Sequence, residues 1–174
     1  FLKRAMDIIG SLILIICTSP LMLFAAVGVK LSSPGPILFR QERVGLNKKP
    51  FYMYKFRSMR AQDGSIHVSA KKDDDRITKV GHIIRKFRID ELPQLINVLK
   101  SDMSIVGPRP EMLENVEKYT DDLPEFRYRL RAKAGLTGLA QIYGKYNTSP
   151  RDKLIMDLAY IQQYSVWLDL KLIL

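Results

Sequence analysis

The most restrictive feature of this sequence is a run of 22 residues, from Ile8 to Val29, that contains no charged side chain. Lys3 and Arg4 precede the run and Lys30 follows it. As a straight helix it would be about 33 Å long, enough to cross a hydrocarbon layer roughly 30 Å thick. We therefore expect a membrane-associated helix, with a buried core helix as the alternative. The lack of a small-residue cleavage site argues against a signal peptide.

Ser19-Pro20 interrupts this run near its middle. Proline removes a backbone donor and clashes with the preceding turn, so the helix should bend here, and the Ser19 hydroxyl can bond a freed carbonyl. A bent helix can span the bilayer, or it can enter one leaflet and return to the same face. Basic residues at both ends favour this second, re-entrant topology, because Lys and Arg prefer the cytoplasmic side.

The chain as a whole is basic and has the composition of a globular protein. Its 28 Lys plus Arg against 18 Asp plus Glu leave a net charge of +10, and 47% hydrophobic against 26% charged residues exclude a disordered chain. Two short apolar runs, 37–39 and 51–56, predict a β-hairpin with a loose loop. Its seven basic residues suit anionic lipid or single-stranded nucleic acid, and the preceding membrane segment favours lipid. They are Arg40, Arg43, Lys48, Lys49, Lys55, Arg57 and Arg60.

Asp90 and Glu91 lie where two helical patterns meet, one over 83–87 and the other over 92–99. Pro93 is tolerated only in the first turn of a helix, so the second helix should begin near Asp90 and hold both carboxylates at its positive end. An ionised Asp90 with three basic residues one turn upstream would be a nucleophile toward phosphorus. Two adjacent carboxylates also suit Mg²⁺. Helix capping is the alternative interpretation.

A second candidate element is the tetrapeptide Gly107-Pro108-Arg109-Pro110. One glycine and two prolines stiffen the backbone around a single guanidinium, whose planar fork can bind two phosphate oxygens. The alternative is a rigid turn in which the arginine is incidental.

With these elements in view, the chain resembles the bacterial sugar transferase domain, the monotopic phosphoglycosyl transferase superfamily. The closest likeness is to polyprenyl-phosphate hexose-1-phosphate transferases of exopolysaccharide, capsule or O-antigen synthesis. The likeness follows the chain in order and covers almost all of it. Its motifs are SSPGPILFRQERVG (32–45), YKFRSMR (54–60), DELPQLINVLKSDMSIVGPRPE (90–111) and AGLTGLAQIYG (134–144).

The resemblance implies a two-step reaction. Asp90 would attack the sugar-bearing phosphorus of a nucleotide diphosphate sugar, usually UDP-linked, and expel UMP. Polyprenyl phosphate would then take the sugar phosphate from the aspartyl intermediate. Glu91 matches the second carboxylate of the family's Asp-Glu dyad, which is implicated in Mg²⁺ binding, so both acids are candidate metal ligands.

The resemblance also implies roles for other residues. Arg85 and Arg109 match basic positions of the family and are candidates to hold phosphates, as are Lys55 and Arg57 of the hairpin. Asp157 matches an acidic position, with a surface salt bridge as the alternative. Gln141, beside the glycines of 135–138, is a candidate to face the nucleotide, together with Lys133. Ser19 and Pro20 match the family's helix-breaking pair, which supports the re-entrant topology.

The expected fold is α+β and mostly helical, with a re-entrant membrane helix over 1–30 and a catalytic domain over 31–174. This domain should hold the hairpin and amphipathic helices at the membrane interface, among them 115–131 and a C-terminal helix around Trp167. We expect the bacterial inner membrane, with the active site on the cytoplasmic face, no nucleic-acid partner, and a longer parent chain. Assembly with a second copy stays open, as does a competing function: a non-catalytic, membrane-anchored basic module.

Overall fold

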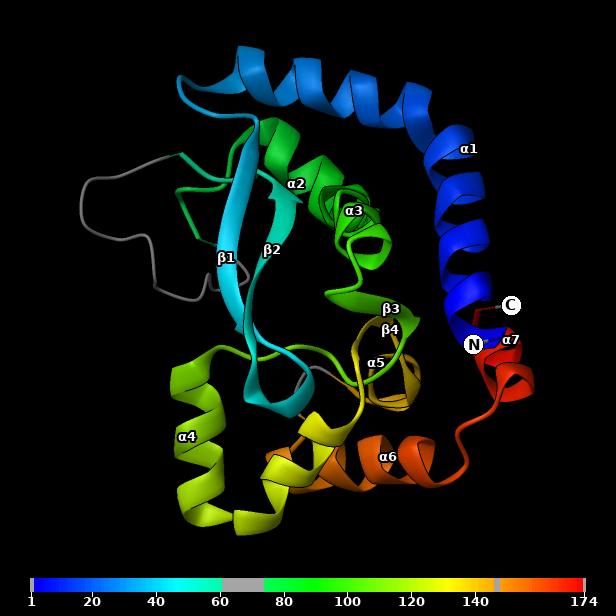
Figure 1. Cartoon of the computed structure of the whole chain (residues 1–174). Coiled ribbons are helices and arrows are strands. Elements are labelled where there is room, and N and C mark those ends of the chain that lie inside the picture. The colour runs from blue at the N-terminus through cyan, green and yellow to red at the C-terminus, as the bar shows by residue number, and fades with distance from the viewer. Residues whose placement is uncertain (1, 61–73, 146–147, 174) are drawn as a thin grey trace.

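The computed structural model describes residues 2–60, 74–145 and 148–173. Within them the chain is α+β and mostly helical, as expected. The long helix α1 (Leu2–Ser32) wraps two sides of the remaining elements, and a hairpin lies beside α2 (Lys79–Lys86) and α3 (Gln94–Leu99) (Figure 1).

Helix α1 turns sharply along its length instead of running straight (Figure 1). Pro20 lies inside it and has no N–H for the Ile16 carbonyl, and the Ser19 hydroxyl donates to that same carbonyl over 2.8 Å. The expected compensation is therefore present, and the helix continues through the bend. Only Asp7, Ser11, Ala25 and Val29 of α1 are buried, so it is no core helix. Its length and apolar composition are sufficient to cross a membrane.

The predicted hairpin consists of β1 (Leu38–Val44) and β2 (Pro50–Phe56), paired antiparallel with Leu38 opposite Phe56 and Val44 opposite Pro50. Strand β1 is longer than the expected 37–39, because the charged stretch that follows stays paired along all of β2. A short 3-10 turn, Leu46–Lys48, fills the loop.

A second sheet of two parallel strands, β3 (Met103–Val106) and β4 (Ala134–Thr137), was not predicted. All four residues of β3 are buried. The pairing continues past β3, where the Gly107 amide donates to the Thr137 carbonyl and the Gly135 amide to the Pro108 carbonyl, each over 2.9 Å. This sheet joins the motif of 107–110 to the glycine-rich motif of 134–138.

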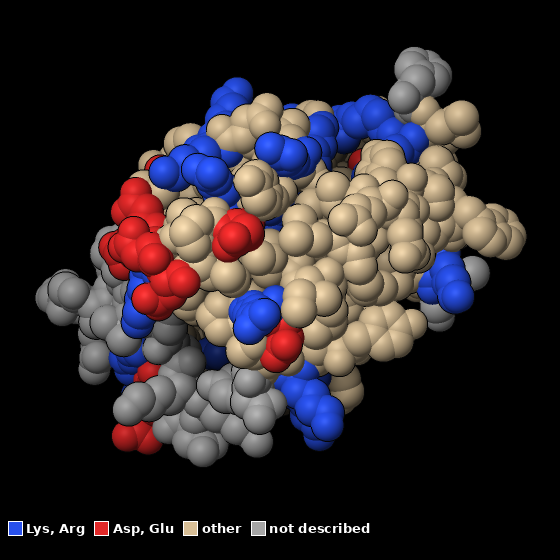
Figure 2. All heavy atoms as spheres, turned by 90° about the horizontal axis from the view of Figure 1, so that it is seen from below, with Lys and Arg blue, Asp and Glu red and all other residues tan. Residues whose placement is uncertain are grey.

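Four further helices and a 3-10 segment are found in the described residues after β3: α4 (Leu113–Asp122), η3 (Pro124–Arg131), α5 (Leu139–Tyr143), α6 (Pro150–Gln162) and α7 (Val166–Ile173). The expected helix over 115–131 is thus two elements, divided at Pro124. Figure 2 shows the face that includes α4, η3 and α6, with acidic side chains gathered on the α4 side and basic ones along the upper edge.

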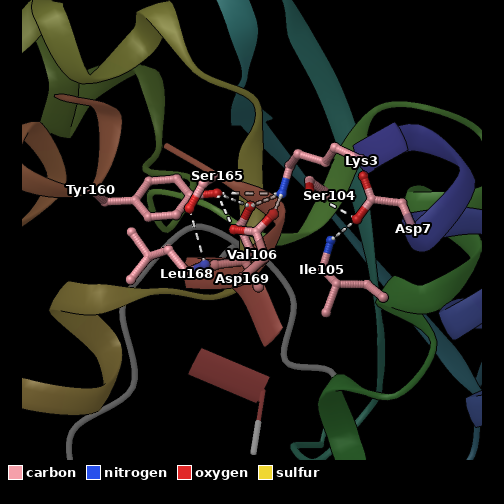
Figure 3. Close-up of polar contacts among 9 residues, drawn as sticks. All are labelled: Lys3, Asp7, Ser104, Ile105, Val106, Tyr160, Ser165, Leu168 and Asp169. Carbon is pink, nitrogen blue, oxygen red and sulfur yellow. Dashed lines mark hydrogen bonds and ion pairs between the residues drawn. The ribbon is translucent and has the colours of Figure 1, made fainter. Parts of the chain in front are cut away.

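The first turn of α1 is tied to the protein interior by polar contacts (Figure 3). The Asp7 carboxylate accepts from the Ser104 hydroxyl and the Ile105 amide, both over 2.9 Å. The Lys3 ammonium pairs with Asp169 of α7 over 2.5 Å. Asp169 therefore faces inward, whereas Trp167 of the same helix is 79% exposed.

We expect Gly135→Ala to lower the free energy of unfolding by about 3 kcal/mol or more, because overpacking against rigid atoms is destabilising. A Cβ there would lie 2.1 Å from the Gly107 nitrogen and 2.5 Å from the Thr137 carbonyl oxygen, and backbone atoms cannot give way. Denaturant unfolding in mild detergent measures the change. Gly10→Ala is the matched control, since its Cβ meets only the end of the Ile105 side chain at 2.9 Å. Equal losses in the two variants would contradict the expectation.

Candidate active site

Asp90 and Glu91 lie in a 3-10 turn, η2 (Ile89–Glu91), between α2 and α3. The expected joint between two helices is present, but the second helix begins at Gln94, with Pro93 at its N-cap. Arg88 explains the difference, because its φ of 57° is left-handed and ends the preceding helical turn. The two carboxylates are therefore carried by a tight turn, and not by the first turn of α3 as expected.

Glu91 is the centre of a cluster of cations. Its Oε1 accepts from Lys55 Nζ over 3.2 Å and from an Arg109 terminal nitrogen over 2.5 Å, and Arg88 lies 3.5 Å away. Burial by itself would raise the pKa of Glu91, but the hydrogen bond and charge of Arg109, with Lys55 and Arg88, hold it at about 2. Glu91 is consequently ionised at neutral pH.

Asp90 differs from its neighbour in its surroundings. It is 9% exposed, and its Oδ1 atom is buried and has no hydrogen-bond partner among the described residues. Burial and the negative charge of Glu91 raise its pKa, against the opposing charges of Lys55 and Arg85. Glu91 therefore makes the direct contacts with cations, whereas Asp90 has a poorly solvated oxygen without a hydrogen-bond partner among the described residues. The ionised state expected for Asp90 stays a prediction.

Arg109 is held in place from behind by a buried ion pair. Its carbonyl accepts from the Arg129 guanidinium over 2.9 Å, and the same guanidinium pairs with Asp157 of α6 over 2.8 Å. Arg129 and Asp157 are 3% and 1% exposed. The surface salt bridge that was the alternative for Asp157 is therefore wrong: α6 turns this residue inward, where burial raises its pKa against the pull of Arg129.

The other predicted site residues divide into two groups. Lys55 contacts Glu91 directly, and Arg85 lies close enough to influence the pKa of Asp90. Arg57 is buried and donates to the carbonyls of Ser33 and Pro34, over 2.7 and 2.6 Å, so the structure engages it in holding the chain after α1. A part for Arg57 in phosphate binding stays a prediction.

Gln141 and Lys133 occupy different places. Both amide atoms of Gln141 in α5 are buried without a hydrogen-bond partner among the described residues. Lys133 donates to the Ser101 hydroxyl over 2.5 Å and lines a pocket near the first turn of α1. The structure does not bring Lys133 to the Asp90–Glu91 turn, and contact with a nucleotide stays a prediction for Gln141.

The donor set of the turn fits the Mg²⁺ expected from the sequence. Mg²⁺ is commonly bound by one or two protein carboxylates together with substrate phosphates. Within the described part of the chain, Asp90 Oδ1 has no hydrogen-bond partner, and Glu91 Oε2 accepts one long hydrogen bond, 3.3 Å from Arg109. A carboxylate oxygen can accept two, so each acid retains a free acceptor position. Among the described residues there is no group of three or more His, Cys, Asp or Glu residues that would hold a metal alone.

Arg129 was missed by the sequence analysis. It lies in a segment with several similar arginines, and only the burial of Phe126 and Arg129 on one side of η3 distinguishes it. Arg43 was predicted to suit an anionic partner together with the other basic residues of the hairpin; in the structure it donates to the Pro110 carbonyl over 3.3 Å and lies beside the cluster around Glu91. A spacing pattern in η3 would not have identified the partner of Arg129, because Asp157 is 28 residues further along the chain.

Comparison with known proteins identifies the family of the chain. A family model for bacterial sugar transferases matches residues 1–174. A UDP-glucose:undecaprenyl-phosphate glucose-1-phosphate transferase of Caulobacter vibrioides is 45% identical, over 99% of this chain and 67% of its own length. A UDP-N-acetylgalactosamine-undecaprenyl-phosphate N-acetylgalactosaminephosphotransferase of Aeromonas hydrophila is 46% identical, over 99% of this chain and 42% of its own. The exopolysaccharide production protein PSS of Rhizobium leguminosarum is 42% identical, over 99% and 91%.

The chain therefore belongs to the bacterial sugar transferase family. The resemblance noted in the sequence is confirmed, and with it the prediction of a transferase. The chain spans about two fifths of the length of the Aeromonas relative, whose remaining part has no counterpart in it.

We expect Asp157→Asn to lower the free energy of unfolding by about 3 kcal/mol, because it leaves the buried Arg129 charge unneutralised. Denaturant unfolding in mild detergent measures the loss. Asp122→Asn, at the exposed end of α4, removes one carboxylate with no described ion pair and should change stability by less than about 0.5 kcal/mol. A loss for Asp157→Asn as small as that of the control would contradict a structural role for the pair.

Proposed function

We propose that this chain transfers a sugar 1-phosphate from a nucleotide diphosphate sugar, such as a UDP-hexose, to polyprenyl phosphate. The observation that carries the proposal is the pairing of a buried, unpartnered Asp90 oxygen with an adjacent cluster of cations around Glu91. The names of the relatives support both substrate classes, since those proteins are named for UDP-sugars and undecaprenyl phosphate.

Asp90 is the proposed nucleophile of the first step. An oxygen of its carboxylate bonds to the sugar-bearing phosphorus while the bond from that phosphorus to the bridging oxygen breaks and UMP leaves. Burial favours this role, because Oδ1 has no hydrogen bond to give up before it attacks. In the second step an oxygen of polyprenyl phosphate attacks the same phosphorus, and the Asp90 carboxylate is released.

The cations around Glu91 are the proposed binding site of the diphosphate. Arg109 is a planar fork held at a fixed place by its backbone contacts, and Lys55 is mostly buried beside it. Their charges would offset the repulsion between the Asp90 carboxylate and an anionic substrate. Glu91 keeps these cations together, and Arg85 adds a further positive charge near Asp90.

Mg²⁺ is the proposed cofactor. Asp90 and Glu91 would hold it through the free acceptor positions of their carboxylates. When bound, the ion would neutralise the diphosphate and stabilise the departing UMP oxyanion.

We expect Asp90→Asn to reduce UMP release from a UDP-sugar by at least about a thousandfold, because loss of a covalent nucleophile can slow an enzyme by as much as about a millionfold. Release is measured over a panel of UDP-sugars with undecaprenyl phosphate and Mg²⁺, which also identifies the sugar. The matched control is Asp152→Asn, an exposed acid of α6. Membrane association should be unchanged in both variants. Full turnover by Asp90→Asn would reject the nucleophile, and no UMP release from the parent chain would favour the non-catalytic basic module.

We further propose that α1 is re-entrant and that the chain works at the cytoplasmic face of the bacterial inner membrane. The sharp turn of α1, its exposed apolar surface and the basic residues near both ends support this topology. The active site would then meet a soluble nucleotide sugar on one side and a lipid-linked phosphate at headgroup level on the other. The division into an anchor over 1–30 and a catalytic domain over 31–174 stays a prediction, and α1 itself continues to Ser32.

Accessibility labelling tests the topology. In a Cys17→Ser background, single cysteines at Leu2 and Leu31, which are 73% and 82% exposed, should both react with an impermeant thiol reagent from the same side of the membrane. A cysteine at Lys118, exposed on α4, reports the side on which the catalytic part lies. Labelling of Leu2→Cys and Leu31→Cys from opposite sides would show a spanning helix.

A further inference from the structure

A pocket of about 420 Å³ lies apart from the Asp90–Glu91 turn, next to the first turn of α1. Its walls come from that turn, the hairpin loop, the end of β3, the segment between η3 and β4, and the end of α6. None of its lining residues contacts Glu91 or Asp90 in the described structure. The mechanism proposed above therefore leaves it without a role.

Four cations line this pocket: Lys3, Arg4, Arg131 and Lys133. Lys3 is neutralised by Asp169, whereas Arg4 donates to two uncharged acceptors, the carbonyls of Val98 and Leu99, over 2.6 and 2.8 Å.

Lys133 donates to a hydroxyl, and among the described residues neither Arg4, Arg131 nor Lys133 has a carboxylate partner. The one lining carboxylate, Asp7, already accepts from Ser104 and Ile105. The pocket thus carries an excess of positive charge.

The position of Lys133 shows the same excess. Burial lowers the pKa of Lys133, and the positive charges of Arg4 and Lys3 lower it further. The negative charges of Asp7 and Asp102 oppose this shift. A site in which cations disfavour one another's charge is stabilised by an anion that enters it.

The rest of the wall is apolar and lies close to the membrane-associated part of the chain. Val106, Ile161 and the rings of Tyr160 and Tyr164 contribute to it. Lys3, near the start of α1, lines the pocket. Its ammonium pairs with Asp169 of α7 (Figure 3). Trp167 of that same helix is exposed. A ligand that matches both the cations and the apolar side chains of the pocket has an anionic group next to an apolar part.

We propose that this pocket binds the phosphate headgroup of an anionic membrane lipid, with the apolar wall against the lipid's glycerol and upper acyl region. The site is separate from the one that takes the substrates, and its test does not depend on the transfer reaction.

The test is a native mass spectrometry titration of the detergent-solubilised chain with dioctanoyl phosphatidylglycerol and, separately, dioctanoyl phosphatidylcholine. We expect binding of phosphatidylglycerol in preference to phosphatidylcholine. Arg131→Gln with Lys133→Gln should weaken phosphatidylglycerol binding by about tenfold or more, since each basic residue near anionic lipid contributes on the order of 1 kcal/mol. Lys133→Arg, which keeps the charge, should retain the preference.

The matched control is Lys118→Gln with Arg151→Gln, which removes two exposed cations from α4 and α6, away from the lining of the pocket. Circular dichroism confirms that each variant is folded. Equal binding of the two lipids, or equal weakening in the pocket and control variants, would overturn the proposal. Glycerol 3-phosphate forms the last arm: displacement of the lipid by an equal concentration of this soluble headgroup would show a free-phosphate site and would overturn the assignment to lipid.

Discussion

The ion pair between Glu91 and Arg109 is the interaction on which the site depends. It joins a 3-10 turn between two helices to the loop that follows a buried parallel strand. Arg109 is in turn held through its carbonyl by Arg129, and Arg129 by Asp157. Two ion pairs, Asp157–Arg129 and Arg109–Glu91, are thus joined through the Arg109 carbonyl. Removal of Asp157 leaves the buried Arg129 charge without a partner of opposite sign among the described residues.

This series of charges needs a backbone that places Arg109 within reach of Glu91. The close approach of Gly107 and Gly135 supplies it, since a side chain at either position would meet backbone atoms at 2.1–2.3 Å. The two short strands β3 and β4 therefore contribute to the hydrophobic core and also fix the loop that carries Arg109. The close contact between Gly107 and Gly135 also brings together the motifs of 107–110 and 134–138, which are 24 residues apart at their nearest ends.

Local features of this chain could be predicted from the sequence, whereas its long-range pairings could not. The bend at Pro20, the hairpin and the joint at Asp90 each follow from neighbouring residues. The parallel pairing of β3 with β4 has no such signal, because four buried residues show no alternation between a polar and an apolar face. Likewise, nothing near Arg129 distinguishes it from Arg127 or Arg131; its burial is decided by packing against α6. Asp90 and Glu91 lie between two helices as predicted, but in a 3-10 turn and not in the first turn of α3. That Glu91 contacts the cations depends on Lys55 and Arg109, which come from two distant segments.

The hydrogen bonds of Asp7 and Lys3 give the membrane helix an additional property. A membrane helix joined to the catalytic part by a flexible linker would leave the distance between that part and the bilayer unfixed. Here the first two turns of α1 are bonded to the strand that leads into the loop of Arg109, and through Asp169 to the last helix. In the proposed re-entrant topology, the depth to which α1 enters the lipid would therefore set the height of Asp90 relative to the headgroups. A bilayer of different thickness would then move the proposed nucleophile together with the anchor, so lipid composition would act directly on the geometry of the proposed acceptor step.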